Sequence, residues 1–246
     1  MSNSQVGTYK FEAFPFHLDV RGKLSMGVLG KHLLNCADAY AAERGFDVVE
    51  QGGEHYTWVL SRLAIELEDL PSCHESFSIQ TWVENVYRLF ADRNFVICNK
   101  DEKPIGYVRS VWAMISMETR NPANLLDLHG DRITNSICEK ECPIAKPGRI
   151  KVSQQEAVSE YVAKYSDLDI NGHVNSIKYI EHILDIFPLD IYKKKALKRF
   201  EIAYVAESYY GDTLSFYLEE KNENEYDIEV RKSSTEVVVR SKVIFK

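Results

Sequence analysis

The 246-residue sequence has few cysteines, no long apolar run and no excess of basic residues. No stretch approaches the ~18 apolar residues of a membrane-spanning helix, so we expect no membrane span. The five cysteines are odd in number and scattered, which suits a reducing compartment better than a disulfide framework. The formal net charge of −7 argues against nucleic acid as a partner, because nucleic-acid binding needs a basic face.

Targeting and metal-binding signals are also missing. The start, MSNSQVGTYKFEAFPF, has neither the basic end and apolar stretch of a signal peptide nor the character of a transit peptide, so we expect a cytosolic protein of bacterial type. Cys138 and Cys142 form a C-x-x-x-C pair, but no neighbouring His or second Cys pair completes a zinc site. We therefore predict no metal and no diffusible cofactor.

What the chain does contain is an internal repeat. Residues 18–25 read LDVRGKLS and residues 168–175 read LDINGHVN, at an offset of 150. A second register, at an offset of 137, relates residues 62–79 to residues 199–216. Both registers keep the same order, and a longer helix or loop in the first half would absorb the difference between them. We infer a tandem duplication of two units.

The two copies differ in their polar turn. Arg21 of the first copy corresponds to Asn171, and Lys23 corresponds to His173. Only the second copy therefore keeps a polar turn that contains His. This asymmetry places the chemistry in the second half of the chain.

Each half shows the same order of expected elements. An aromatic strand, at 8–16 and again at 157–165, leads into the turn, and a helix follows it. The first helix is expected from about Met26 to Arg44, and Asn175 or Ser176 is suited to cap the second. Alternating apolar residues then predict strands at 63–67, 77–81, 92–99 and 106–117, and at 200–204, 214–218, 225–232 and 235–245.

One long helix followed by antiparallel strands favours an α+β fold in which a curled sheet wraps around its own helix. The segment 121–150 is rich in proline and lacks clear periodicity, which is typical of a linker. We assign an N-terminal domain to 1–130, a linker to 131–152 and a C-terminal domain to 153–246.

The motifs of both halves resemble those of one family, the acyl-acyl carrier protein thioesterases. Plant members carry D-x-N-x-H-V-N-N-x-K-Y at the polar turn. That pattern is filled here by Asp169, Asn171, His173, Val174, Asn175, Lys178 and Tyr179, with Ser176 in place of the second Asn of the N-N pair. The family's T-W-V-E, arginine, S-x-W-x-M and T-R are matched in the first half by 81–84, Arg93, 110–114 and 119–120.

The resemblance implies a tandem of two hotdog domains that hydrolyses fatty acyl-acyl carrier protein to free fatty acid, with the acidic carrier protein as partner. Three rivals stay open. An acyl-CoA thioesterase would run the same reaction on another carrier, a hotdog dehydratase or hydratase would also use His with a carboxylate, and an acyl-binding module would have no activity. The sequence leaves the oligomeric state open, a homodimer included.

The polar turn offers the groups that thioester hydrolysis needs. His173 can exchange a proton near neutral pH, and Asn171 can bond to water and to a carbonyl. Asp169 can fix one of them by a hydrogen bond, but its counterpart Asp19 indicates a supporting role for this position. The helix start at 174–176 is expected to offer unbonded N–H groups to the thioester oxygen.

The resemblance assigns the general base to Glu207, and we expect its carboxylate to be partly buried. Many plant members have Cys directly after this position, whereas this chain has Ser208. A serine without an evident base is a poor replacement for a thiolate, which favours attack by water over a covalent acyl-enzyme. Ser208 as nucleophile is the alternative.

Substrate contacts are assigned to residues of both halves. Trp58, Trp82 and Trp112 either pack the core or line an acyl pocket. Arg93, Asn175 and Ser208 complete the expected substrate-binding set. For the acidic carrier protein, the densest basic cluster consists of Lys193, Lys194, Lys195, Lys198 and Arg199.

Overall fold

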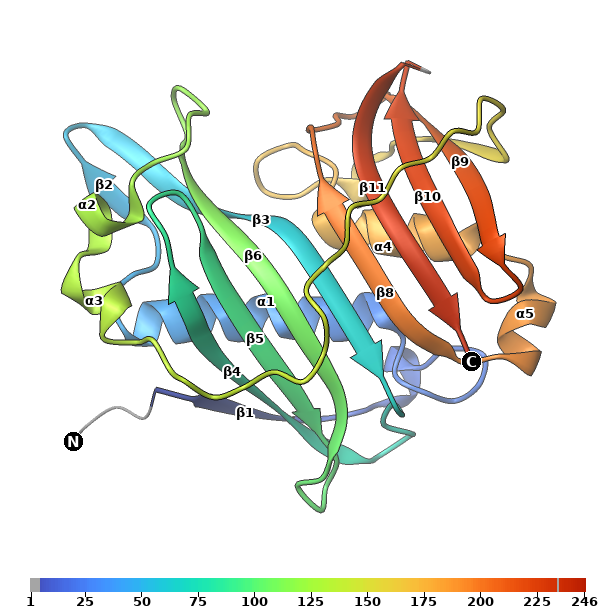
Figure 1. Cartoon of the computed structure of the whole chain (residues 1–246), viewed down its shortest axis with the longest axis horizontal. Helices are drawn as coiled ribbons and strands as arrows, with labels where there is room; N and C mark the ends of the chain where they lie inside the picture. Colours follow the sequence, from blue (N-terminus) through green and yellow to red (C-terminus); the bar gives the residue numbers. More distant parts are fainter. Residues whose placement is uncertain (1–4, 234) are drawn as a thin grey trace. The chain divides into compact units, whose positions relative to one another are not determined.

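The computed structural model describes residues 5–233 and 235–246, which form two compact units (Figure 1). The first unit contains the chain up to Leu24, Val28–Ser61 and Glu68–Ala145. The second contains Ser25–Gly27, Arg62–Leu67 and Lys146–Lys246. The last boundary between the units, at 145–146, falls inside the segment assigned to the linker.

The first unit is an antiparallel sheet with one long helix, and its strands lie in the order β1-β4-β5-β6-β3. Leu29, Leu33 and Tyr40 recur at helical spacing on α1 and are buried, because this stripe of the helix packs in the core. The elements are β1 (Gly7–Glu12), η1 (Pro15–His17), α1 (Met26–Glu43), β2 (Val49–Gln51), β3 (Glu54–Leu67), β4 (Ser76–Val86), β5 (Ala91–Cys98), β6 (Pro104–Ser116), α2 (Leu125–His129) and α3 (Asp131–Thr134).

The second unit repeats this plan, with strands in the order β8-β11-β10-β9-β7. The buried face of α4 carries Ile177, Ile180 and Ile183. Residues 62–66 of β3, which group with this unit, pair antiparallel with β8. The elements are β7 (Ser159–Val162), η2 (Tyr165–Asp167), α4 (Ser176–Asp185), α5 (Leu189–Lys194), β8 (Leu197–Tyr204), β9 (Thr213–Asn222), β10 (Glu225–Lys232) and β11 (Glu236–Phe245).

Each unit is therefore a curled antiparallel sheet around a helix, the arrangement called a hotdog (Figure 1). The predicted α+β class and the repeated hotdog plan are confirmed. α1 has 18 residues and α4 has 10, so the longer first helix absorbs most of the shift between the two sequence registers.

The first strand of each unit is shorter than predicted. β1 ends at Glu12, and the chain then enters η1 at Pro15, which has no N–H to donate to a sheet. β7 ends at Val162 and is followed by η2. β2, the first half of β3 and α5 were not predicted, because they are short or lack a clear period.

The segment predicted to be a linker is partly folded. It contains α2 and α3, helices of five and four residues that are too short to show a helical period. Beyond them the irregular chain is bonded to the first sheet, where Trp82 Nε1 donates to Lys140 O (2.9 Å) and Arg109 Nη2 donates to Cys142 O (2.7 Å). The segment is thus a strap on the sheet.

Within the described ranges, no helix combines the length and apolar character needed to cross a bilayer. In the same ranges, no group of three or more His, Cys, Asp or Glu side chains is placed to hold a metal ion.

Candidate active site

The polar turn of the second unit is shaped by Asp169. Its Oδ1 accepts hydrogen bonds from Asn171 N (2.8 Å) and His173 N (3.1 Å), and its own N–H donates to His173 O (2.8 Å). Gly172 has a φ of 79°, a conformation that glycine adopts without steric cost. Asp19 forms the same side-chain bonds in the first unit, to Arg21 N and Lys23 N, so this aspartate shapes the turn in both copies.

The turn is joined to the loop that follows β8. Val174 N donates to Ser208 O (2.8 Å), and His173 forms a β-bridge with Tyr209. These contacts bring His173 to Glu207, with 3.5 Å between Nε2 and Oε2. The His173 side chain is 17% exposed and the Glu207 side chain is 38% exposed, so solvent reaches the carboxylate.

Tyr209 is a site residue that the sequence analysis missed. Its hydroxyl donates to Glu207 Oε2 (3.3 Å), and its ring stands edge-on to His173 with centroids 5.2 Å apart. Lys232 Nζ donates to the backbone oxygen of Glu207 (3.0 Å). The one sequence signal for Tyr209 is its position directly after the AYVAES segment.

The corresponding positions of the first unit carry different chemistry. At the offset of 137, Glu207 corresponds to Leu70, which is buried. His173 corresponds to Lys23, whose Nζ lies 2.9 Å from Asp69 Oδ1 in an ion pair. The first copy therefore has an apolar side chain and an ion pair where the second has an imidazole facing a carboxylate.

The helix start differs from the prediction. Asn175 caps α4 as expected, since its Oδ1 accepts from Ile177 N (2.9 Å). However, Val174 N is bonded to Ser208 O and Asn175 N is bonded to Asp167 O (2.8 Å). The expectation that 174–176 offers unbonded N–H groups is thus wrong for the first two residues, because those groups anchor the turn.

Asn171 lies exposed at the tip of the turn, and its N–H bonds to Asp169. Ser208 is 1% exposed, and among the described residues its Oγ has no hydrogen-bond partner. Its neighbour is the Tyr179 hydroxyl, and burial raises the pKa of Tyr179 to about 12. The Ser208 hydroxyl therefore points into the core beside a protonated phenol.

The three tryptophans belong to the first unit and donate to protein acceptors. Trp82 is fully buried in a cluster with Val96 and Cys98. Trp58 is partly buried, and its Nε1 donates to Phe46 O (2.8 Å). Trp112 is also partly buried and bonds Ser110 Oγ (2.8 Å). Full burial makes Trp82 a core residue, whereas Trp58 and Trp112 keep exposed surface.

Arg93 is a buried cation in the first unit. Its guanidinium lies over the ring of Tyr40, 4.5 Å from the centroid, and Nη1 donates to Thr81 Oγ1 (3.3 Å). Burial lowers the pKa of Arg93 to about 10. Arg93 thus places a positive charge in the interior of the first unit, where the Tyr40 ring and the Thr81 hydroxyl stabilise it.

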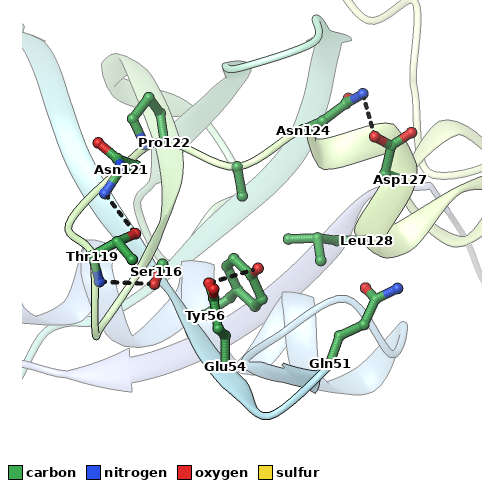
Figure 2. Close-up of a pocket in the computed structure, with 11 residues that line it drawn as sticks. Gln51, Glu54, Tyr56, Ser116, Thr119, Asn121, Pro122, Asn124, Asp127 and Leu128 are labelled. Carbon is green, nitrogen blue, oxygen red and sulfur yellow. Dashed lines mark hydrogen bonds between the residues drawn. The ribbon is translucent and has the colours of Figure 1, made fainter.

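A pocket of about 380 Å³ also lies in the first unit (Figure 2). Its wall is mostly polar and includes Glu54, Tyr56, Asn121 and Asp127. Several of these groups bond one another, as Tyr56 does with Glu54 (3.0 Å). The residues that line it include none of the predicted site residues.

Two hotdog units in one chain, one of which holds a His–Glu pair at the start of its helix, define the double-hotdog class. The family model of the acyl-ACP thioesterase N-terminal domain matches residues 5–130. The model of the C-terminal domain of the same enzymes matches residues 150–246. The chain belongs to the acyl-ACP thioesterase family.

The curated relatives of the chain include plant enzymes. The chain is 26% identical over 177 residues to the chloroplastic palmitoyl-acyl carrier protein thioesterase of Gossypium hirsutum, covering 69% of this chain and 43% of the relative. It is 28% identical over 183 residues to the oleoyl-acyl carrier protein thioesterase 2 of Arabidopsis thaliana, covering 70% and 49%. The chain thus spans less than half the length of these relatives.

Two solved structures each cover at least 98% of the chain. An acyl-ACP thioesterase from Bacteroides thetaiotaomicron is 60% identical, with a TM-score of 0.93 and 98% of each chain covered. The 12:0-ACP thioesterase from Umbellularia californica is 16% identical, with a TM-score of 0.85 and 99% and 98% covered. The second likeness shows the fold alone.

Proposed function

We propose that the protein hydrolyses the thioester of fatty acyl-acyl carrier protein to free fatty acid and carrier protein. Membership of the acyl-ACP thioesterase family supports the reaction class. The observation that carries the assignment of the site is the 3.5 Å approach of His173 Nε2 to Glu207 Oε2. At the corresponding positions the first copy has Lys23 and Leu70, which cannot form such a pair.

In the proposed mechanism Glu207 is the general base. The oxygen of a water molecule bonds to the thioester carbonyl carbon while one water proton passes to the Glu207 carboxylate. The carbonyl oxygen then carries the negative charge. When the carbon–sulfur bond breaks, the carrier thiolate leaves and takes up the proton from Glu207, so the acid product is released and the base is restored.

The neighbouring groups have supporting roles. His173 and the Tyr209 hydroxyl both contact Glu207 Oε2 and hold the carboxylate in place. The side-chain amide of Asn171 donates to the thioester oxygen, since the N–H groups of Val174 and Asn175 are already bonded. Asp169 shapes the turn without touching the substrate.

We propose that the acyl chain contacts Trp58 and Trp112, which keep exposed surface. The charge of Arg93 would then mark one limit of the space that the acyl chain occupies. Trp82, at 0% exposed, packs with Cys142 and Ile144 in a cluster separate from the one that Trp58 contacts. Asn175 and Ser208 serve the site through the helix cap and through the backbone oxygen that receives Val174 N.

The test is a rate comparison on matched acyl-carrier-protein and acyl-CoA substrates, with free fatty acid as the measured product. The proposal expects faster release from the carrier protein. Faster release from acyl-CoA would instead identify the protein as an acyl-CoA thioesterase. Acyl binding without release from either substrate would make the protein a binding module and overturn the proposed activity.

A further inference from the structure

A buried carboxylate directly precedes the polar turn. Asp167 is 2% exposed. Its Oδ2 accepts from Tyr161 OH (2.8 Å) and Lys164 N (2.8 Å), and its Oδ1 lies 3.1 Å from His182 Nε2. These bonds join β7, the start of η2 and α4 at one side chain.

The same residue anchors the turn through its backbone. Asp167 O accepts from Asn175 N (2.8 Å), the cap of α4. His182, further along α4, holds the Asp167 side chain. The turn from Leu168 to Val174 therefore starts directly after Asp167 and ends directly before Asn175, which is bonded to Asp167. Because His173 lies within this turn, its place beside Glu207 depends on that anchor.

At neutral pH Asp167 is ionised and Tyr161 keeps its proton, because of the shifts in their pKa values. Burial opposes ionisation of Asp167, but the bonds from Lys164, Tyr161 and His182 outweigh it, and the pKa of Asp167 lies below its ordinary value. Burial and the bond to Asp167 raise the pKa of Tyr161 to about 12. A charged carboxylate and a protonated phenol keep both side-chain bonds formed.

The first unit keeps the packing of this anchor without its carboxylate. At the offset of 150, Tyr161 corresponds to Phe11, Asp167 to His17 and His182 to His32. The ring centroids of Phe11 and His32 are 4.2 Å apart, and those of Tyr161 and His182 are 4.0 Å apart.

The polar bonding differs between the two copies. His32 Nε2 is buried and has no hydrogen-bond partner among the described residues, whereas His182 Nε2 faces a carboxylate. Packing alone therefore does not require the Asp–His pair at this place in the fold. The pair occurs in the copy that carries His173 and Glu207.

We propose that Asp167 and His182 are positioning residues, which hold the polar turn so that His173 and Asn171 face Glu207 and the thioester. The proposal rests on the function proposed above. Neither residue touches the substrate, and both act through the bond between Asp167 O and Asn175 N. A displacement of about 1 Å in such a turn is enough to cost ~10²-fold in rate.

The test compares two replacements of His182. His182→Phe keeps an aromatic ring against Tyr161 but removes the donor to Asp167, and we expect kcat to fall about 10- to 100-fold with KM changed less than threefold. In His182→Gln the side-chain amide can still donate to Asp167 Oδ1. We expect this variant to recover kcat to within about threefold of the wild type.

The matched control is His32→Phe, the same change at the corresponding place in the first unit. We expect it to leave kcat within about twofold, even where the melting temperature shifts. Should His182→Phe fold poorly, Tyr161→Phe supplies a milder variant, because Phe11 already occupies the matching position. It removes one donor to Asp167, and we expect a kcat loss of roughly three- to tenfold.

The outcomes separate this proposal from the function itself. A wild-type protein without thioester hydrolysis would overturn the proposed function. An active wild type with unchanged kcat in both His182→Phe and Tyr161→Phe would overturn the positioning role alone. The positioning role would also be lost if His182→Gln fell as far as His182→Phe, or if His32→Phe matched its effect on kcat.

Discussion

Val174 N donates to Ser208 O over 2.8 Å, and these two residues directly follow His173 and Glu207. The approach of imidazole to carboxylate is thus set by a backbone hydrogen bond between their neighbours. Replacing either side chain leaves this bond in place. Variants at 173 and 207 should therefore change chemistry with little change in the path of the chain.

Glu207→Gln should lower kcat by about 10²- to 10⁴-fold, because the amide keeps the size of the side chain but cannot take a proton from water. Steady-state kinetics on an acyl-carrier-protein substrate measures the loss. The control is Ser208→Ala, which we expect to cost little, since the Ser208 hydroxyl points into the core. An inactive Ser208→Ala variant, with an acyl adduct trapped on Ser208, would overturn the water mechanism.

His173→Ala and Asn171→Ala should each remove most turnover while the melting temperature stays within a few degrees. The reason is that a polar turn contributes little packing to the core. The matched variants Lys23→Ala and Arg21→Ala, at the same places in the first unit, should keep kcat within a few-fold. Equal losses in both copies would contradict the assignment of the chemistry to one unit.

The internal repeat could be predicted from the sequence, because both copies of the turn require the same side-chain hydrogen bonds to the backbone. Asp19 and Asp169 bond the same two N–H groups of their turns, so the shared Asp reflects a shared local structure. The end of α1 follows from the glycine at position 45, and most strands follow from apolar periods. These properties depend on residues that are close in the sequence, so short sequence patterns are enough to predict them.

Contacts between distant segments could not be predicted in the same way. Arg199 counted as part of a surface basic cluster, but it is buried and pairs with Glu201 and Glu66, both at 2.7 Å. Likewise, the N–H groups of 174 and 175 find acceptors that no spacing rule indicates. Side-chain direction and burial depend on the packed sheet, which a single sequence does not specify.

Charge reversal at Lys194 and Lys198 should raise KM for the acidic carrier protein and spare a short acyl-CoA substrate. Both residues are exposed, whereas Arg199 is excluded from the cluster by its buried ion pairs. The effect should shrink at high salt, because screening weakens exposed charge pairs. The control reverses Lys100 and Lys103, also exposed. An unchanged KM would mean that the carrier protein docks at another surface.

The free energy of unfolding at acid pH should depend on His129, which lies in the first unit. It is 2% exposed, its ring stacks on Trp58 with centroids 5.9 Å apart, and its Nε2 lies 3.2 Å from Met114 Sδ. Burial, with a smaller effect from Arg132, lowers the pKa of His129 to about 4. The imidazole is therefore neutral in the folded protein at pH 5.

An unfolded chain binds a proton at this histidine below about pH 6.5, its ordinary pKa. Between about pH 6.5 and pH 4 the unfolded state thus holds more protons than the folded state, and stability falls as the pH falls. The full difference amounts to ~3 kcal/mol. Above pH 7 both states are neutral and the contribution vanishes.

His129→Phe should flatten this part of the profile, because Phe keeps a ring against Trp58 but binds no proton. Urea unfolding at pH 7.5 and pH 4.5 measures the change in the free energy of unfolding for both proteins. If His129→Phe kept the full loss of stability between these pH values, another buried group would have to carry it.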